Sequence, residues 1–218
     1  MFDTDSSSGL WMPRRLWPLS VFTATHLIGF GAGASAPLVY ATWNPSDKNA
    51  SVTLSGGNLT AASGANIGGR ATGGKSSGKW YVEFAVDTGG SGMLLGVANS
   101  SASLSNYPAA DANAWCYYAD GRKANNASFS AYGNSYTTSV KVQIALDRDN
   151  GKVFFGKNNT WQNSGDPAAG TNAAYTGLSG TLMCIIGSAS ASIQATGNWG
   201  ASAFTYAPPS GFSGWTNP

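Results

Sequence analysis

The chain has 218 residues, which is long enough to bury one sizeable core and is typical of a single domain when that domain is built from strands. Only 10% of the residues are charged and the formal net charge is +2, which argues against a protein that binds nucleic acid by neutralising its phosphates. The 29 glycines, together with many Ser, Thr, Asn and Ala residues, predict frequent turns and a neutral polar surface.

Residues 1–38 differ in composition from the rest of the chain. They begin with a polar stretch that holds two acids, pass through Arg14 and Arg15, and then become apolar. The pattern imitates a secretory signal, but the acids precede the arginines and Pro37 would follow the cleavage point. Proline, histidine and glycine interrupt the apolar stretch, so we expect no membrane span. We expect an extended attachment arm at 1–38 and a separate domain at 39–218.

The arm carries side chains that suit attachment to a partner. A large apolar side chain that enters a pocket contributes roughly 1.5 to 3 kcal/mol, and an arginine can make paired hydrogen bonds to a carboxylate. The candidate attachment residues are Trp11, Arg14, Arg15, Trp17, Phe22 and Phe30.

From residue 38 onward, the sequence predicts short strands separated by glycine-rich turns. The clearest strand covers residues 79–87, and its apolar side chains share one face: Trp80, Val82, Phe84 and Val86. The other expected strands lie at 38–43, 51–54, 59–61, 69–72, 93–98, 114–119, 127–130, 181–187 and 192–199. Because turn signals recur between them and no helical periodicity of useful length is present, the sequence predicts an all-β sandwich or barrel.

Residues 140–157 carry the clearest hairpin signal. The first strand alternates apolar and more polar residues, which is the period-two pattern of a strand with one buried face. Asn150 and Gly151 then predict a two-residue type I′ turn, because both residue types tolerate positive φ. Such a turn pairs Leu146 with Phe155 and places both on the buried face.

The stretch 145–158, which reads Ala-Leu-Asp-Arg-Asp-Asn-Gly-Lys-Val-Phe-Phe-Gly-Lys-Asn, resembles the signature hairpin of SPRY (B30.2-like) domains. Further segments resemble the family in the same order, at 77–84, 95–98, 118–121, 198–200, 204–206 and 209–212. The resemblance covers residues 40 to 215. It implies an antiparallel two-sheet β-sandwich, which the arm would precede.

Two other segments, 41–47 and 165–172, resemble the variant of the family found in bacteriophage structural proteins. Members of the family are protein-interaction or adhesion modules rather than enzymes. The resemblance therefore implies a non-enzymatic virion protein, a component of the tail or tail fibre that is present in multiple copies in a symmetric assembly. The arm would bind other virion proteins, and the domain would bind a host surface glycan or protein or a neighbouring virion protein.

Three alternatives remain open at this point. The same arm could anchor a capsid decoration protein on the exterior of the head. The chain could also be a free lectin-like module that binds carbohydrate or protein without any role in a virion. The third alternative is an enzyme.

The sequence offers few residues that could catalyse a reaction. The only histidine, His26, lies in the arm, which excludes a Ser-His-Asp arrangement or a His/Cys metal cluster inside the domain. Glycoside hydrolysis needs two carboxylates, and Glu83 is the only glutamate. The candidate partners, most of which are explained as turn residues, are Asp111, Asp120, Asp147, Asp149 and Asp166. We therefore expect no enzyme activity, no cofactor and no metal site.

Aromatic residues in polar loops are the candidate binding residues. Long loops are predicted at 99–113, 131–138 and 158–176, and binding usually sits in such loops on a rigid sandwich. Aromatic rings offer contact area to a sugar or a protein at low entropic cost. The candidates are Trp161, Tyr107, Tyr132, Tyr136 and Tyr175. Trp161 is the first choice, because the Asn, Gln, Ser and Gly residues around it can hydrogen-bond hydroxyl groups.

The two cysteines, Cys116 and Cys184, both lie in apolar strand-like runs. We expect buried thiols, since a free cysteine behaves as a small hydrophobic residue. The sequence leaves open whether the two form a disulfide.

Overall fold

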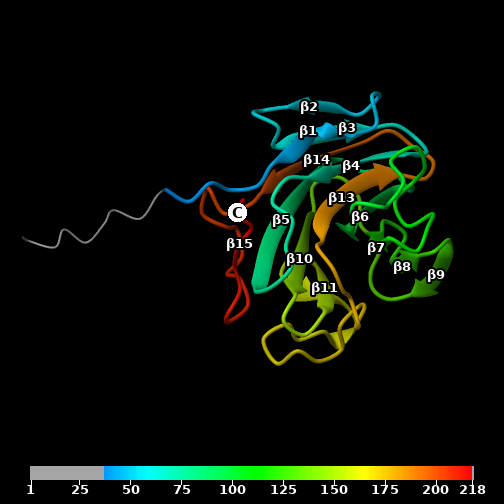
Figure 1. The fold of residues 1–218 in the computed structure, drawn as a ribbon. Helices are drawn as coiled ribbons and strands as arrows, with labels where there is room; N and C mark the ends of the chain where they lie inside the picture. Colours follow the sequence, from blue (N-terminus) through cyan, green and yellow to red (C-terminus); the bar gives the residue numbers. More distant parts are fainter. Residues whose placement is uncertain (1–36, 218) are drawn as a thin grey trace, which may run out of the picture. The chain divides into compact units, whose positions relative to one another are not determined.

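The structure is a computed structural model that describes residues 37–217. The predicted attachment residues lie outside the described residues: Trp11, Arg14, Arg15, Trp17, Phe22 and Phe30. The expected arm and its boundary at residue 38 therefore stay predictions. The described part is nearly all β and forms a two-sheet sandwich, as the sequence predicts (Figure 1).

The larger sheet has the strand order β12-β11-β10-β5-β14-β3-β2, and β15 pairs with β5. All of its pairings are antiparallel except that of β15, which runs parallel to β5. Its strands are β2 (Thr53–Ser55), β3 (Thr60–Ser63), β5 (Lys79–Thr88), β10 (Lys141–Asp147), β11 (Lys152–Lys157), β12 (Thr160–Trp161), β14 (Ile193–Asn198) and β15 (Ser213–Gly214). The long β5 and its neighbour β10 lie in the middle of this sheet (Figure 1).

The smaller sheet is antiparallel, with the order β13-β6-β7-β8-β9. Its strands are β6 (Met93–Ala98), β7 (Ala114–Tyr118), β8 (Arg122–Asn125), β9 (Ser128–Ala131) and β13 (Met183–Ser188). A separate pair joins β1 (Trp43–Lys48) to β4 (Ile67–Ala71), and bridges on either side of β4 connect this part of the chain to the region of β13. One short 3-10 helix, η1 (Gln162–Ser164), follows β12.

Most of the predicted strands are confirmed within one to three residues, and the clearest prediction, at 79–87, corresponds to β5. The first prediction was misplaced, since β1 begins only at Trp43. The sequence does not predict β8, whose residues Arg-Lys-Ala-Asn offer no apolar alternation. This strand forms because it continues the hairpin from β7 and packs Ala124 against the sheet.

The main core lies between the inner faces of the two sheets. The larger sheet contributes alternate residues of β5, β10 and β11, and the smaller sheet contributes alternate residues of β6, β7 and β13. These inward residues are Val82, Phe84, Val86, Val142, Ile144, Leu146, Val153, Phe155, Met93, Leu95, Val97, Tyr117, Cys184 and Ile186. The period-two pattern thus identifies the inner face correctly, although Trp80 is only partly buried at the edge of this core.

The prediction of one buried and one exposed face was wrong for β10. Its second face is also buried, and the side chains of Gln143 and Asp147 are 1% and 0% exposed. Ala145 lies there in a second cluster with Tyr81, Phe154 and Phe212. The C-terminal segment and the segment after β11 cover this face with Phe204, Phe212, Trp161 and Ala173, so polar residues that look solvent-facing in the sequence are enclosed.

The predicted hairpin register was wrong by two residues. Leu146 pairs with Val153, and Asp147 pairs with Lys152, which closes a four-residue loop instead of a two-residue turn. Only Gly151 in this loop has a positive φ, of 60°, whereas Asn150 does not. The loop is longer because the Asp147 carboxylate accepts hydrogen bonds from the backbone and side-chain N–H groups of Asn150. A shift of two residues preserves the faces, so Val153 and Phe155 still point inward.

The two cysteines are free and buried. Cys184 belongs to the core between the sheets, whereas Cys116 belongs to the cluster on the outer face of the smaller sheet. Strand β6 lies between their strands, and Gly96 pairs with Cys116 while Val97 pairs with Cys184. The sheet itself therefore separates the two sulfur atoms, and burial raises the pKa of both thiols.

Candidate functional site

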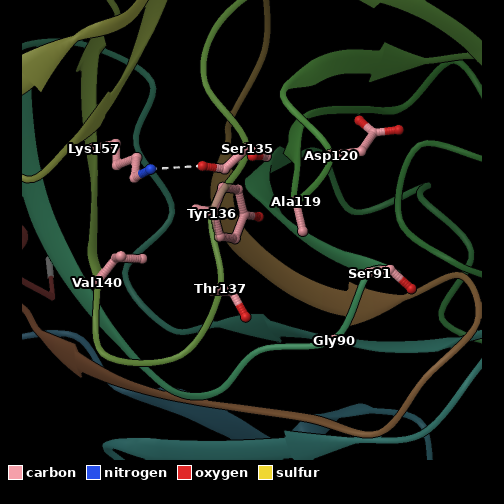
Figure 2. A pocket seen from close by; sticks show the side chains of 9 residues that line it. All are labelled: Gly90, Ser91, Ala119, Asp120, Ser135, Tyr136, Thr137, Val140 and Lys157. Atoms are coloured by element: carbon pink, nitrogen blue, oxygen red, sulfur yellow. Dashed lines mark hydrogen bonds between the residues drawn. The ribbon is translucent and has the colours of Figure 1, made fainter.

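A pocket of about 460 Å³ opens between four segments that are far apart in the sequence. The segments are the turn from β5 to β6, the end of β7, the loop from β9 to β10, and the end of β11. The lining residues are Gly90, Ser91, Ala119, Asp120, Ser135, Tyr136, Thr137, Val140 and Lys157 (Figure 2).

The loop from β9 to β10 forms one wall of the pocket and is held from both sides. The backbone N–H of Asn134 donates to Oε1 of the buried Gln162 at 2.7 Å, and its carbonyl accepts a hydrogen bond from the Tyr117 hydroxyl. Farther along, the Thr138 hydroxyl accepts a hydrogen bond from the backbone N–H of Gly89 at 2.9 Å. These contacts tie the wall to η1, to β7 and to the turn that follows β5.

A glycine allows this wall to approach the end of β7. Gly121 has a φ of +99°, and a Cβ atom there would lie 2.5 Å from the carbonyl oxygen of Gly133. Any larger residue would push the loop away from the sheet. The Asp120-Gly121 pair that the sequence analysis noted as part of the family resemblance therefore shapes the pocket.

Tyr136 lies between the two sides of the pocket (Figure 2). Its side chain is 4% exposed, and its hydroxyl donates to the carbonyl oxygens of Tyr117 at 3.0 Å and Met93 at 3.3 Å. Burial raises the pKa of Tyr136 well above its ordinary value, and the nearby Tyr117 adds to the shift. The phenol therefore remains neutral and fixes the depth of the pocket.

Two charged residues lie on opposite sides of the pocket, Asp120 and Lys157 (Figure 2). The Asp120 carboxylate is paired with Arg122, whose Nε donates to it at 2.7 Å and whose Nη2 lies 2.6 Å from the same oxygen. The backbone N–H of Arg122 also donates to this carboxylate, at 3.0 Å.

Lys157 has a different environment. Its ammonium donates to the carbonyl oxygen of Ser135 at 2.7 Å, as the dashed line in Figure 2 shows. The ion pairs among residues 37–217 are Arg70–Asp47, Lys79–Asp147 and Arg122–Asp120. Within that range Lys157 thus has no carboxylate partner, and the pocket carries one uncompensated positive charge.

The lining combines the apolar side chains of Val140 and Ala119 with hydroxyl groups and one ammonium. In the part of the chain that the structure describes, no group of three or more His, Cys, Asp or Glu residues is placed to hold a metal ion. Residues 37–217 also contain no helix that is both long and apolar enough to cross a membrane.

Two of the five predicted binding aromatics are core residues, which corrects the expectation that they offer exposed rings. Tyr132 and Tyr136 are 7% and 4% exposed and pack around Tyr117 in the main core. The Tyr132 hydroxyl accepts a hydrogen bond from the backbone N–H of Phe155 at 3.2 Å, and burial raises the pKa of Tyr132 to about 12. Both residues follow β9 in a polar loop, but the loop folds back over the open edge of the core.

The other three predicted aromatics are half-buried and do not gather at one place. Trp161 packs edge-on against Tyr81 on the outer face of the larger sheet, with 6.4 Å between the ring centroids. Tyr107 packs near Phe129 on the outer face of the smaller sheet. Tyr175 lies at the main core. Of the five, only Tyr136 lines the pocket, so the predicted set does not form one site.

Most of the aspartates act as turn residues, as expected, whereas Asp149 binds a turn that is distant in the sequence. Each accepts hydrogen bonds from backbone N–H groups of nearby or facing turns, and the partners are Ser103 and Asn113 for Asp111, Arg122 for Asp120, Asn150 for Asp147, Gly78 for Asp149, and Ala169 for Asp166. Glu83 is buried and bound to the C-terminal segment, so it faces no open cleft.

The sequence analysis did not single out Ser91, Asp120 or Lys157 as binding residues. A partial signal existed, because the loop at 131–138 was expected to bind and does supply one wall of the pocket. The other walls come from ordinary strand ends. Only the sheet topology brings these ends together, so no local sequence pattern could identify them as parts of one pocket.

Comparison with known proteins agrees with this architecture. A family model described as the SPRY domain matches residues 79–196, which is more than half of the chain. Among solved structures, the crystal structure of the SPRY domain of human HERC1 is similar with a TM-score of 0.56 and 17% identity. That match covers 71% of this chain and 96% of the other, and at this identity it shows the fold alone. No curated protein matches the chain.

Proposed function

Because the chain belongs to the SPRY domain family, whose members are typically protein-binding modules, we propose that residues 37–217 bind a protein partner in the pocket lined by Tyr136 and Lys157. The observation that carries the proposal is the pocket itself. Four segments form it, and its loop wall is held by hydrogen bonds on both sides.

A preformed pocket favours binding because little conformational entropy is lost when the partner enters. A volume of about 460 Å³ has room for a few side chains of a partner loop. The walls offer hydroxyl and backbone groups for orientation, and the apolar Val140 and Ala119 for contact. Such a mixed lining is typical of a non-obligate protein interface.

Photo-cross-linking tests this proposal. A benzoylphenylalanine at Thr137, which is exposed on the rim of the pocket, should cross-link to a protein partner in a host extract or assembled particle. The same probe at Ser179, which is exposed but follows Leu178 beside the hairpin loop, is the control. Equal cross-linking from both positions, or none from Thr137, would contradict a partner in the pocket.

The finer part of the proposal concerns the biological setting. We propose a non-enzymatic virion protein of a bacteriophage, in the tail or tail fibre, that is present in multiple copies and anchored by residues 1–38. The support is the resemblance of segments 41–47 and 165–172 to the phage variant of the family, and the neutral polar composition. Immunogold labelling of purified particles tests the location. Label on the head rather than the tail would favour capsid decoration, and unlabelled particles would contradict a virion protein.

A further inference from the structure

We propose that Lys157 makes this pocket a carboxylate-binding site, into which the protein partner inserts an aspartate or glutamate side chain. The inference rests on the proposed function, because it names the chemistry that the same pocket selects. It predicts that the partner segment is acidic.

The position of Lys157 is fixed by its strand and by the loop opposite. Lys157 ends β11 and pairs with Val142 in β10. The next residue, Asn158, makes two hydrogen bonds to Lys141. Its backbone N–H donates to the Lys141 carbonyl at 2.9 Å, and its side-chain oxygen accepts from the Lys141 backbone N–H at 2.8 Å. The ammonium then reaches Ser135 across the pocket wall. A half-buried lysine held in this way loses little further entropy when it binds a partner.

The ammonium has free capacity for hydrogen bonds. A lysine carries three N–H donors, and the carbonyl of Ser135 takes one of them. Figure 2 shows the side chain at the side of the pocket, with Tyr136 next to it. The remaining donors are available to an acceptor in the pocket, and an ionised acceptor makes the strongest bond.

The electrostatics of the lining favour an anion. Asp120 on the opposite side is bound by the Arg122 guanidinium and does not compensate Lys157. Tyr136 stays neutral because burial raises its pKa. The charge that remains in the pocket is therefore positive, and a negatively charged partner group would neutralise it.

Hydroxyl groups complete the site. Ser91 and Thr137 are both exposed and line the pocket from two other segments. The Thr137 hydroxyl donates to the Gly89 carbonyl only at 3.4 Å, a long bond that a better acceptor can replace. A carboxylate accepts hydrogen bonds at two oxygens, so it can use more than one donor. A single lysine suits this singly charged group better than a phosphate, which is typically bound by several arginines.

The test is titration of the full-length ¹⁵N-labelled protein with two capped peptides, acetyl-Gly-Ser-Glu-Ser-Gly-amide and its glutamine analogue, followed by NMR. We expect the glutamate peptide to shift the amide signals of Ser91, Ser135 and Thr137, and to bind about tenfold more tightly than the glutamine peptide. We also expect its affinity to fall as the salt concentration rises.

Lys157→Gln and Lys152→Gln form a matched pair of variants. The two lysines lie at the two ends of β11, and each donates to one loop carbonyl at 2.7 Å, Lys157 to Ser135 and Lys152 to Gly170. Each substitution therefore removes one positive charge beside a loop carbonyl, but only Lys157 lines the pocket. We expect the preference for glutamate to disappear in Lys157→Gln and to persist in Lys152→Gln. Thermal melting of both variants checks that they are folded.

Several results would overturn the inference. If both peptides shift the pocket signals with equal affinity, the pocket binds peptides without selecting a carboxylate, and the proposed function stands while the inference fails. An unchanged preference in a folded Lys157→Gln variant also refutes it. If glucuronate binds the pocket more tightly than the glutamate peptide does, the site serves an acidic polysaccharide instead. Absence of any shift refutes the carboxylate site, and cross-linking from Thr137 then decides the proposed function separately.

Discussion

The carboxylate of Glu83, buried in the middle of β5, accepts a hydrogen bond at 2.8 Å from the backbone N–H of Tyr206. Its other oxygen accepts one from Thr205 at 2.9 Å. The Tyr81 hydroxyl donates to the same carboxylate at 3.0 Å and accepts from Gln143 at 3.1 Å. The only glutamate of the chain therefore fastens the C-terminal segment to the outer face of the larger sheet.

Replacement of Glu83 by alanine should loosen this segment. The substitution leaves two backbone N–H groups and one hydroxyl without their acceptor, which costs about 2 to 4 kcal/mol in the free energy of unfolding. We expect limited proteolysis to cut the Glu83→Ala variant first near residues 204–212. Asp87→Ala is the control, because Asp87 lies exposed near the C-terminal end of the same strand. Equal resistance in both variants would contradict the role of Glu83.

The inner face of β10 leads to a second prediction. Leu146 is fully buried in the main core, so Leu146→Asp places an unpaired carboxylate there at a cost of several kcal/mol, comparable with the stability of a whole domain. We expect this variant to be unfolded by circular dichroism. Lys141→Asp, on a half-exposed residue at the start of the same strand, should melt cooperatively. A soluble Leu146→Asp protein that melts cooperatively would show that the core tolerates a charge.

A third prediction concerns the pH dependence of stability. Lys75 is buried, with its ammonium 3.5 Å from the centroid of the Trp80 ring and bound to the carbonyl of Thr216, and burial lowers its pKa from 10.5 to about 8. Between these two pH values the unfolded chain binds more protons than the folded one at this residue, so its contribution makes stability rise with pH. Buried cysteines and tyrosines have raised pKa values, so their contribution makes stability fall as the pH rises above about 9.

The measurement therefore compares the wild-type protein with the Lys75→Met variant at each pH. We expect the urea midpoint of the wild-type protein, relative to that of Lys75→Met, to rise by an amount equivalent to about 2 kcal/mol between pH 7.5 and pH 9.5. A difference that stays constant across this range would mean that Lys75 titrates at its ordinary pKa in the folded protein.

Trp161 remains a candidate for adhesion. Its ring is half-buried against Tyr81 and is partly open to a partner. We expect Trp161→Ala to weaken attachment to host cells or isolated surface polysaccharide, with only a small fall in melting temperature. Phe204→Ala is the matched control, because Phe204 also packs edge-on against Tyr81, with 4.9 Å between the centroids. If both variants lose stability and neither loses attachment, Trp161 serves only to cover the sheet.

The last prediction concerns residues 1–38. Val39 and Ala41 make backbone hydrogen bonds to the C-terminal residues Asn217 and Trp215, at 2.6 and 2.8 Å, so the sandwich includes the chain from this point onward. A chain that begins at Leu38 should therefore be soluble and melt cooperatively, yet fail to join the particle in place of the full-length protein. Aggregation of the shortened chain would show that the preceding residues belong to the core, and the attachment proposal would then have to be dropped.

The sequence alone determined the features that depend on near neighbours. Alternation in residues 140–146 identified the inner face of β10, and the aspartates were recognised as turn residues because they bond to backbone groups close by. The family resemblance gave the sandwich, which the match to residues 79–196 confirmed.

Only the tertiary structure decided which polar residues are buried on the outer face of the larger sheet and which segments form the pocket. Gln143 and Glu83 look exposed in a period-two pattern, but both are buried. Two backbone N–H groups of the C-terminal segment, 122 and 123 residues beyond Glu83, donate to that carboxylate, whereas Gln143 bonds to the Tyr81 hydroxyl and the backbone N–H of Asn159. The hairpin register is an exception, because the bonds that replaced the expected turn are local and join Asp147 to Asn150, three residues farther along the chain. The pocket joins Ser91, Asp120 and Lys157 through strand order. Burial of polar groups and the meeting of distant strand ends are set by partners far along the chain, so a local pattern cannot encode them.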